Sequence, residues 1–348
     1  MKKLPLTWLF SAVLAAHPAL AANGPTTRQL RPFVLPEVPV ELKSGHPESF
    51  DGAVTRVNAY IDSKRAAIKN DENLPFLLTH GGRTRHVALM IHGLTDSPYY
   101  MRSLAEEFYK DGYNVLSILL PGHGTEPHAL MAVELEQWRA EVERGLEMAA
   151  WLGDRISIAG FSTGGALAID AVARNASRQP GTAAAPRDLA QLFLFSPAVR
   201  IQNGALDYVC VAPWLAGFLR PYRQAAASRE DLPARYRKMA TNSICQLHRL
   251  TQDNAANAAT ITGEMLRRRM AVFAVQSEAD DLIDTSAVRA FMDSVPEGLR
   301  KDFILYPGAD DIHHADVTRP ELNPRYEEMR RRIQEFLRRQ KLEEGPQG

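Results

Sequence analysis

The stretch Arg155-Ile-Ser-Ile-Ala-Gly-Phe-Ser-Thr-Gly-Gly-Ala166 decides the fold. Its first half is a short apolar segment typical of a buried strand, and the small residues after Gly164 open a helix. Between them, Gly160 and Gly164 flank Ser162 symmetrically. So tight a turn leaves no room for side chains at the two flanking positions, and it lifts the serine hydroxyl above the sheet edge. The pattern therefore predicts a nucleophile elbow with Ser162 at its tip.

Outward from this turn, apolar strands alternate with amphipathic helices. The expected strands lie at residues 76–78, 86–91, 113–120, 189–195, 270–275 and 303–306. This rhythm is interrupted once, at residues 198–269, where helical stretches and aromatic residues replace it. Strands that alternate with helices favour an α/β fold: an open, mostly parallel sheet with helices on both faces. The interrupting segment is expected to cap the carboxyl ends of the strands, where such sheets bind ligands.

The amino-terminal residues have the pattern of a secretory signal peptide. A basic start, Met1-Lys2-Lys3, precedes a mostly apolar stretch that ends in the small-x-small sequence Ala19-Leu20-Ala21. An uncleaved membrane anchor is disfavoured because the apolar stretch is short and contains Pro5 and Pro18. No later stretch is long and apolar enough to span a bilayer. We therefore expect cleavage after Ala21 and export to the periplasm or the medium.

The chain accordingly divides into five expected segments. They are a signal peptide (1–21), an amino-terminal arm and helix (22–72), the first part of the core (73–197), a cap or lid insertion (198–269) and the second part of the core (270–341).

Charge and cysteine content exclude some functions and bear on the compartment. Lys plus Arg and Asp plus Glu both total 41, so the chain has no overall basic field for binding nucleic acid. Cys210 and Cys245 are the two cysteines of the sequence, and both fall in the expected cap segment. Export to an oxidising compartment favours a disulfide between them, and two separate buried thiols are the alternative.

Three motifs in order resemble those of a known family. His92-Gly93 follows one strand, Leu120-Pro121-Gly122-His123-Gly124-Thr125 follows the next, and the Ser162 turn comes third. Together they resemble the α/β-hydrolase fold, in particular its monoacylglycerol-lipase and bacterial carboxylesterase branch. The resemblance covers about Val87 to Phe336, with only the fold shared through the cap, and it leaves the arm before residue 73 unmatched.

A nucleophilic serine needs a base, and the base needs an orienting carboxylate. In the fold that the chain resembles, the acid and then the histidine follow the serine along the chain. The resemblance places the acid on Asp280, after the 270–275 strand. Asp281 and Asp284 are alternatives, although Asp281 would point away in a tight turn and Asp284 fits a helix N-cap better.

The base is expected after the last strand, where two histidines are adjacent. The resemblance favours His314. In relatives the histidine is followed by a small residue, then by one further residue that precedes an apolar one, and Ala315-Asp316-Val317 fit this order. His313 is the rival candidate.

Further residues are expected around this set. The backbone N–H groups of Thr163 and Leu94 are candidates for an oxyanion hole, and His92 and His123 are expected to brace their loops. Tyr99, Tyr100 and the cap residue Trp214 are candidates for substrate binding. For the two tyrosines, packing within a helix is an equally good interpretation.

The pattern as a whole predicts an exported serine hydrolase of the carboxylesterase or lipase type, acting on a small-molecule or lipid acyl ester through an acyl-enzyme. An amidase, thioesterase or acyltransferase would use the same residues. A non-catalytic binding protein of the same fold is the alternative from another class. The sequence has no His-Glu-x-x-His motif, cysteine cluster or phosphate-binding glycine loop, so we expect neither a metal nor a cofactor.

Overall fold

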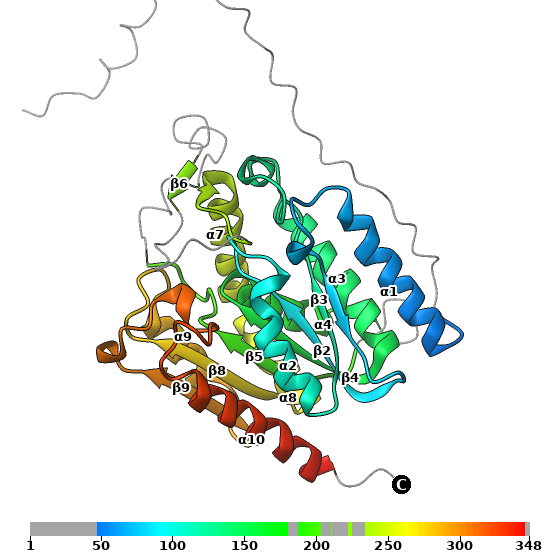
Figure 1. Ribbon diagram of the computed structural model, residues 1–348. Helices are drawn as coiled ribbons and strands as arrows, with labels where there is room; N and C mark the ends of the chain where they lie inside the picture. The colour runs from blue at the N-terminus through cyan, green and yellow to red at the C-terminus, as the bar shows by residue number, and fades with distance from the viewer. Residues whose placement is uncertain (1–46, 180–186, 203–209, 211–221, 225–233, 345–348) are drawn as a thin grey trace, which may run out of the picture. The chain divides into compact units, whose positions relative to one another are not determined.

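The computed structural model describes residues 47–179, 187–202, 210, 222–224 and 234–344 (Figure 1). All of them belong to one compact unit, Val34–Gly348. The expected signal peptide, most of the expected arm and Trp214 lie outside the described residues.

A seven-stranded sheet forms the centre of this unit, with strand order β1-β3-β2-β4-β5-β8-β9. Only β1 runs antiparallel, against β3, and all the other neighbouring pairs are parallel. This confirms the mostly parallel sheet that the sequence predicts. The strands are β1 (Phe76–Leu78), β2 (Thr84–Ile91), β3 (Asn114–Ile118), β4 (Gly153–Phe161), β5 (Leu189–Phe195), β8 (Ala271–Ser277) and β9 (Lys301–Tyr306).

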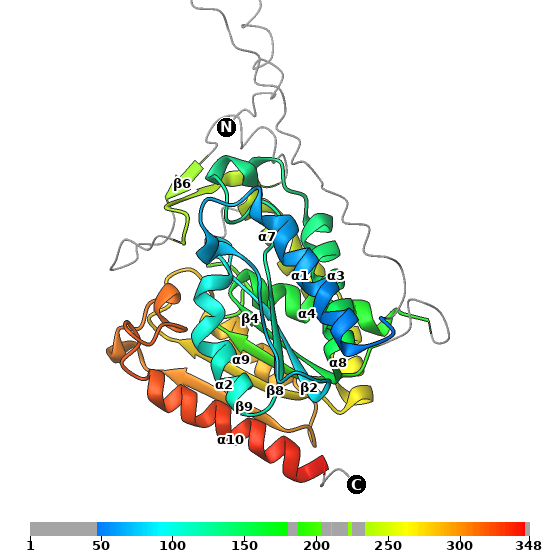
Figure 2. The same cartoon turned by 45° about the vertical axis from the view of Figure 1, so that its right-hand side comes forward.

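Helices cover both faces of the sheet, because its central strands are apolar on both sides. In β2, Val87, Leu89 and Ile91 belong to one hydrophobic cluster, while Ala88 and Met90 belong to a second cluster on the opposite face. Figures 1 and 2 show α2 (Arg102–Lys110) and α10 (Tyr326–Glu344) side by side over the second cluster.

The first cluster is covered by a larger helical layer. Its helices are α1 (Phe50–Arg65), α3 (Leu135–Leu152), α4 (Thr163–Ala176), α7 (Thr241–Ala256), α8 (Ala258–Arg268) and α9 (Thr285–Ser294). Two of these, α7 and α8, come from the expected cap segment and pack against α4. The strand pattern stops in that segment, but part of it still contributes to the core.

Short elements complete the fold at the carboxyl ends of the strands. They are the 3-10 turns η1 (Asp71–Asn73), η2 (Pro98–Met101), η3 (Pro127–Met131), η4 (Gly308–Asp310) and η5 (His314–Asp316), and the paired strands β6 (Tyr222–Gln224) and β7 (Lys238–Ala240). Among the described residues, no helix has the length and apolar character needed to cross a membrane.

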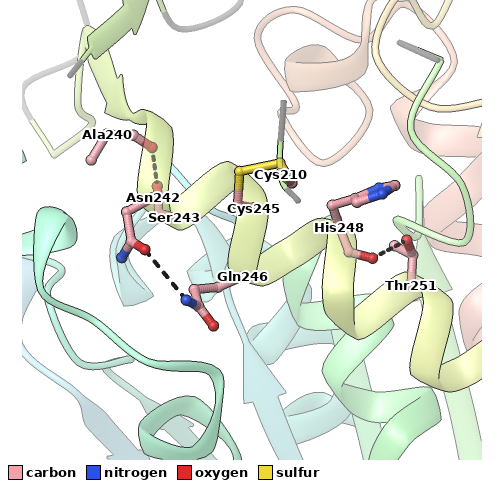
Figure 3. Close-up of a disulfide and its surroundings, with 8 residues drawn as sticks. All are labelled: Cys210, Ala240, Asn242, Ser243, Cys245, Gln246, His248 and Thr251. Carbon is pink, nitrogen blue, oxygen red and sulfur yellow. Dashed lines mark hydrogen bonds between the residues drawn. A yellow bond between two sulfur atoms is a disulfide. The ribbon is translucent and has the colours of Figure 1, made fainter. Parts of the chain in front are cut away.

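A disulfide joins Cys210 to Cys245, which lies near the start of α7 (Figure 3). The two Cα atoms are 5.2 Å apart, and the residues are separated by 35 positions in the sequence. This confirms the pairing that the sequence favours. The bond ties a residue of the expected cap to a helix whose buried side is part of the core.

We predict that reduction of this disulfide lowers the free energy of unfolding by about 2–4 kcal/mol, because the cross-link restricts a long loop of the unfolded chain. Urea unfolding followed by circular dichroism, with and without a reductant, measures the difference. The double variant Cys210→Ala/Cys245→Ala is the control, and its midpoint should not respond to the reductant. An unchanged midpoint for the fully reduced wild-type protein would contradict the prediction.

Candidate active site

The elbow around Ser162 is held by steric contacts of its two glycines. A Cβ atom on Gly160 would lie 2.2 Å from the carbonyl oxygen of Gly164, and one on Gly164 would lie 2.0 Å from that of Ile91. Neither position therefore admits a side chain. Ser162 itself adopts φ 54° and ψ −115°, in a region that non-glycine residues rarely occupy. The turn between β4 and α4 thus holds its serine in a strained backbone conformation.

Ser162, His314 and Asp280 form a hydrogen-bonded chain. His314 Nε2 lies 2.8 Å from Ser162 Oγ, and His314 Nδ1 lies 2.7 Å from Asp280 Oδ2. A carboxylate only accepts hydrogen bonds, so Nδ1 carries the proton in the neutral ring and Nε2 accepts from the serine hydroxyl. All three residues are buried. They follow β4, β8 and β9, so the parallel sheet gathers them at the carboxyl ends of its strands.

The Asp280 carboxylate is held on both oxygens. The backbone N–H groups of Leu282 and Ile283 each donate to Oδ1 at 2.9 Å, and Gln276 Nε2 donates to Oδ2 at 3.0 Å. Burial raises the pKa of Asp280, but attraction to His314 and the donated hydrogen bonds together outweigh it, so the pKa falls below its ordinary value of 3.8. The carboxylate is therefore ionised at neutral pH.

The rival residues lie elsewhere. His313 is 41% exposed at its side chain and lies 3.3 Å from Asp311. Asp281 is exposed. Asp284 caps α9, where its side chain accepts from the N–H groups of Ser286 and Ala287. Of the alternatives weighed from the sequence, the structure brings only His314 and Asp280 to Ser162.

The loop from His92 to Ser97, which we call the 92–97 loop, lies against the elbow. A Cβ atom on Gly164 would lie 2.8 Å from the His92 carbonyl oxygen, and one on Gly93 would lie 2.9 Å from the Phe161 ring. Leu94 is in this loop and is buried. Thr163 is the first residue of α4, so its N–H has no acceptor within the helix. Both expected oxyanion donors thus belong to segments that border Ser162.

Two buried histidines brace this loop, as the sequence predicts. Leu120 N–H donates to His92 Nε2 at 3.1 Å, so the neutral ring carries its proton on Nδ1, which donates to the Gly93 carbonyl at 2.8 Å. Burial lowers the pKa of His92 well below 6.5 and keeps the ring neutral. His123 Nε2 lies 2.8 Å from the Leu94 carbonyl oxygen.

The candidate substrate-binding residues stay predictions. Tyr100 is buried in η2, with its ring 4.2 Å from the Arg319 guanidinium carbon, and Tyr99 is 37% exposed. The two tyrosine rings meet edge to face. In the described part of the chain, no group of three or more His, Cys, Asp or Glu side chains is arranged to hold a metal ion.

Sequence reasoning missed a buried ionic cluster formed by Asp96, Arg235 and Arg319. Asp96 lies three residues after Gly93, and an acidic residue in the loop that follows the buried strand β2 was the available signal. The arginines are far from it in the sequence, and no local pattern distinguishes them.

The state of the Asp280 carboxylate gives a prediction for acid stability. Because its pKa is lowered in the folded protein, the ionised carboxylate stabilises the fold above about pH 4, and this contribution is lost as the pH falls through the folded-state pKa. Asp280→Asn removes it, so the stability gap between wild type and variant should shrink on acidification. Thermal unfolding from pH 7 to pH 2 measures that gap. Asp281→Asn is the matched control at an exposed position. A stability difference between wild type and Asp280→Asn that does not change with pH would contradict the prediction.

Comparison with known proteins identifies the family and the fold of the chain. Residues 82–314 match the family model described as serine aminopeptidase, S33. A thermostable monoacylglycerol lipase of Bacillus sp. strain H-257 is 39% identical over 84 residues, which are 23% of this chain and 32% of that protein. The chain's match therefore spans about a third of this relative.

Solved structures show the same fold at low sequence identity. A metagenome-derived lipolytic enzyme superposes with a TM-score of 0.62 at 20% identity, covering 78% of this chain and 99% of that one. A monoglyceride lipase of Saccharomyces cerevisiae superposes with a TM-score of 0.55 at 14% identity, covering 76% and 90%. The family model spans more than half of the sequence, so the chain belongs to the serine aminopeptidase S33 family and has the α/β-hydrolase fold.

Proposed function

We propose that this protein is a serine hydrolase of the carboxylesterase or lipase type, which cleaves acyl esters through an acyl-enzyme. The observation that carries the proposal is the continuous hydrogen-bonded chain from Ser162 Oγ through His314 to the ionised Asp280. A binding module of the same fold would need none of these three residues. A serine hydroxyl is a poor nucleophile alone, whereas one bonded to a carboxylate-oriented imidazole is activated.

The first half of the proposed reaction forms the acyl-enzyme. Ser162 Oγ attacks the ester carbonyl carbon while His314 Nε2 takes its proton, and the Asp280 carboxylate stabilises the resulting imidazolium. The N–H groups of Leu94 and Thr163 stabilise the oxyanion of the tetrahedral intermediate. The bond between the carbonyl carbon and the alcohol oxygen then breaks, and His314 protonates the leaving alkoxide.

The second half regenerates the serine. His314 takes a proton from a water molecule, whose oxygen attacks the acyl carbon, and the same two N–H groups stabilise the second oxyanion. Collapse of this intermediate breaks the bond to Ser162 Oγ, which recovers a proton from His314. The carboxylic acid leaves, so no cofactor is needed for the cycle.

The proposed substrate is a small-molecule or lipid ester with an apolar acyl or alcohol group. The names of the monoacylglycerol lipase relative and of the lipolytic structural neighbour support an ester. The family description names an aminopeptidase, so amide hydrolysis is the second candidate. Thioesters and acyl transfer would use the same three residues.

Hydrolysis of p-nitrophenyl butyrate tests the proposal. We predict that the wild-type protein releases p-nitrophenol, that His314→Ala lowers kcat by about 10⁴-fold or more because the serine loses its base, and that His313→Ala leaves kcat near the wild-type value. Ser162→Ala measures the background. The corresponding p-nitroanilide distinguishes an amidase from an esterase. Loss of activity in His313→Ala alone, or faster cleavage of the anilide, would be incompatible with the proposal.

We also propose that the protein is exported and acts in the periplasm or the medium. The Cys210–Cys245 disulfide supports this, because disulfides persist in oxidising compartments. The signal-like sequence from Met1 to Ala21 supplies the expected route.

Expression of the full chain in a Gram-negative host tests export. We predict that the protein recovered from the periplasm or the medium begins at Ala22, as read by amino-terminal sequencing. A variant with Leu9→Arg and Leu14→Arg, which interrupts the apolar stretch, should stay in the cytoplasm with Met1 or Lys2 at its start. Wild-type protein that accumulates in the cytoplasm with its first residues intact would refute the proposal.

A further inference from the structure

We infer that Asp96 is a positioning residue for the reaction: through Arg235 and Arg319 it fixes the turn that carries the Leu94 N–H. This inference rests on the proposed function, because it gives that N–H a role in holding the oxyanion. Asp96, Arg235 and Arg319 do not contact the reacting atoms. They determine the position of the Leu94 N–H, which does.

One turn of the 92–97 loop surrounds Leu94. Asp96 N–H donates to the Gly93 carbonyl at 3.2 Å, which closes the turn Gly93-Leu94-Thr95-Asp96. The Gly93 carbonyl and the Leu94 N–H belong to one peptide unit. A Cβ atom on Gly93 would lie 3.0 Å from Asp96 Oδ2, so the carboxylate packs directly against the start of the turn. Asp96 and His92, whose Nδ1 donates to the same Gly93 carbonyl at 2.8 Å, therefore together set the orientation of the peptide that carries the proposed donor.

The Asp96 carboxylate is fixed in turn by two arginines from distant segments. Arg235 Nε lies 3.2 Å from Asp96 Oδ1, and an Arg319 guanidinium nitrogen lies 3.8 Å from the same oxygen. The Asp96 and Arg319 side chains are 2% exposed and that of Arg235 is 8% exposed. Arg319 follows η5, which begins with His314. One carboxylate thus links the 92–97 loop to the segment that supplies the proposed base.

The segment that carries Arg235 also holds the backbone directly after Leu94. Arg235 Nε donates to Thr95 Oγ1 at 2.9 Å, and Tyr236 N–H donates to the Thr95 carbonyl at 2.8 Å. The Tyr236 hydroxyl donates to the Gly122 carbonyl at 3.0 Å. Residues 235 and 236 therefore hold two loops at the carboxyl end of the sheet in a fixed relation.

The negative charge of Asp96 holds the segments of Arg235 and Arg319 beside the 92–97 loop. Within the described residues, Asp96 is the carboxylate that pairs with both buried guanidinium groups, and the three Arg319 nitrogens have no hydrogen-bond partner there. Loss of the carboxylate charge would leave two buried cations beside each other, a costly state that the segments relieve by moving apart. Because Asp96 is part of the turn, such movement displaces the Leu94 N–H.

The effect on catalysis has a specific signature. A donor aimed at the oxyanion acts mainly in the transition state, so its displacement lowers kcat and leaves KM nearly unchanged. A trifluoromethyl ketone adds Ser162 Oγ to its carbonyl carbon and forms an oxyanion in the same place. Its affinity should therefore fall together with kcat/KM. A residue needed only for stability would change the fraction of folded enzyme and leave the inhibition constant unchanged.

Asp96→Asn is the test, because it keeps the shape of the side chain and removes its charge. On p-nitrophenyl butyrate we expect kcat to fall about 10- to 100-fold, while KM stays within about threefold of the wild-type value. Displacing one oxyanion donor can lower kcat by at most the factor that its complete removal would cause. The inhibition constant of the trifluoromethyl ketone should rise by the same factor as kcat/KM falls. If Asp96→Asn does not fold, Arg235→Gln removes the bond to Thr95 and should show the same two changes more weakly.

Asp170→Asn is the matched control. Asp170 lies on α4 and pairs with Arg139 at 2.6 Å, and the two side chains are 7% and 9% exposed. Asp170 is eight residues after Ser162, about 12 Å along the helix axis. This variant should lose stability, whereas kcat per folded molecule and the inhibition constant should stay at wild-type values.

Wild-type kcat and inhibition constant in both Asp96→Asn and Arg235→Gln would overturn the inference and leave the esterase proposal intact. A lowered kcat with an unchanged inhibition constant would also overturn it, because that result indicates a purely structural role. A wild-type protein that neither hydrolyses the ester nor binds the ketone would refute the proposed function itself, and this inference with it.

Discussion

The structure depends on the close approach of the first turn of α4 to the end of β2. Gly164 makes this approach possible, because any side chain there would collide with the Ile91 carbonyl. The same contact holds Ser162 at a positive φ and places the 92–97 loop beside it. One steric constraint thus positions both the serine hydroxyl and the loop that carries Leu94, before any hydrogen bond of the site is considered.

Two buried carboxylates, Asp280 and Asp96, have different electrostatic roles at this edge of the sheet. Asp280 receives hydrogen bonds from backbone N–H groups and from Gln276, so it stays ionised and orients His314. Asp96 instead faces two arginines and links segments that are distant in the sequence. Such pairs gain little net stability from being buried, and we infer that this one serves to fix one arrangement of the segments. In this protein that arrangement surrounds the proposed oxyanion site.

The sequence predicts those parts of the protein whose cause is local. The parallel sheet follows from the strand pattern, and the elbow follows from the glycines beside Ser162. The choice of His314 over its neighbour came from family resemblance, because adjacent residues share one local context. The Asp96 cluster escaped prediction because its arginines reach the 92–97 loop only through the tertiary fold. Similarly, residues 198–269 showed helical stretches, but their pattern did not indicate that α7 and α8 would pack against α4 and join the core.

Covalent labelling measures whether the geometry around Ser162 makes its hydroxyl a nucleophile. The folded protein is treated with a fluorophosphonate, and intact-mass spectrometry and peptide mapping follow. We predict one adduct per chain, on Ser162, which forms far more slowly after heat denaturation or in His314→Ala. A folded, disulfide-intact protein that gains no adduct, or that carries it on another residue, would show that Ser162 is not an activated nucleophile.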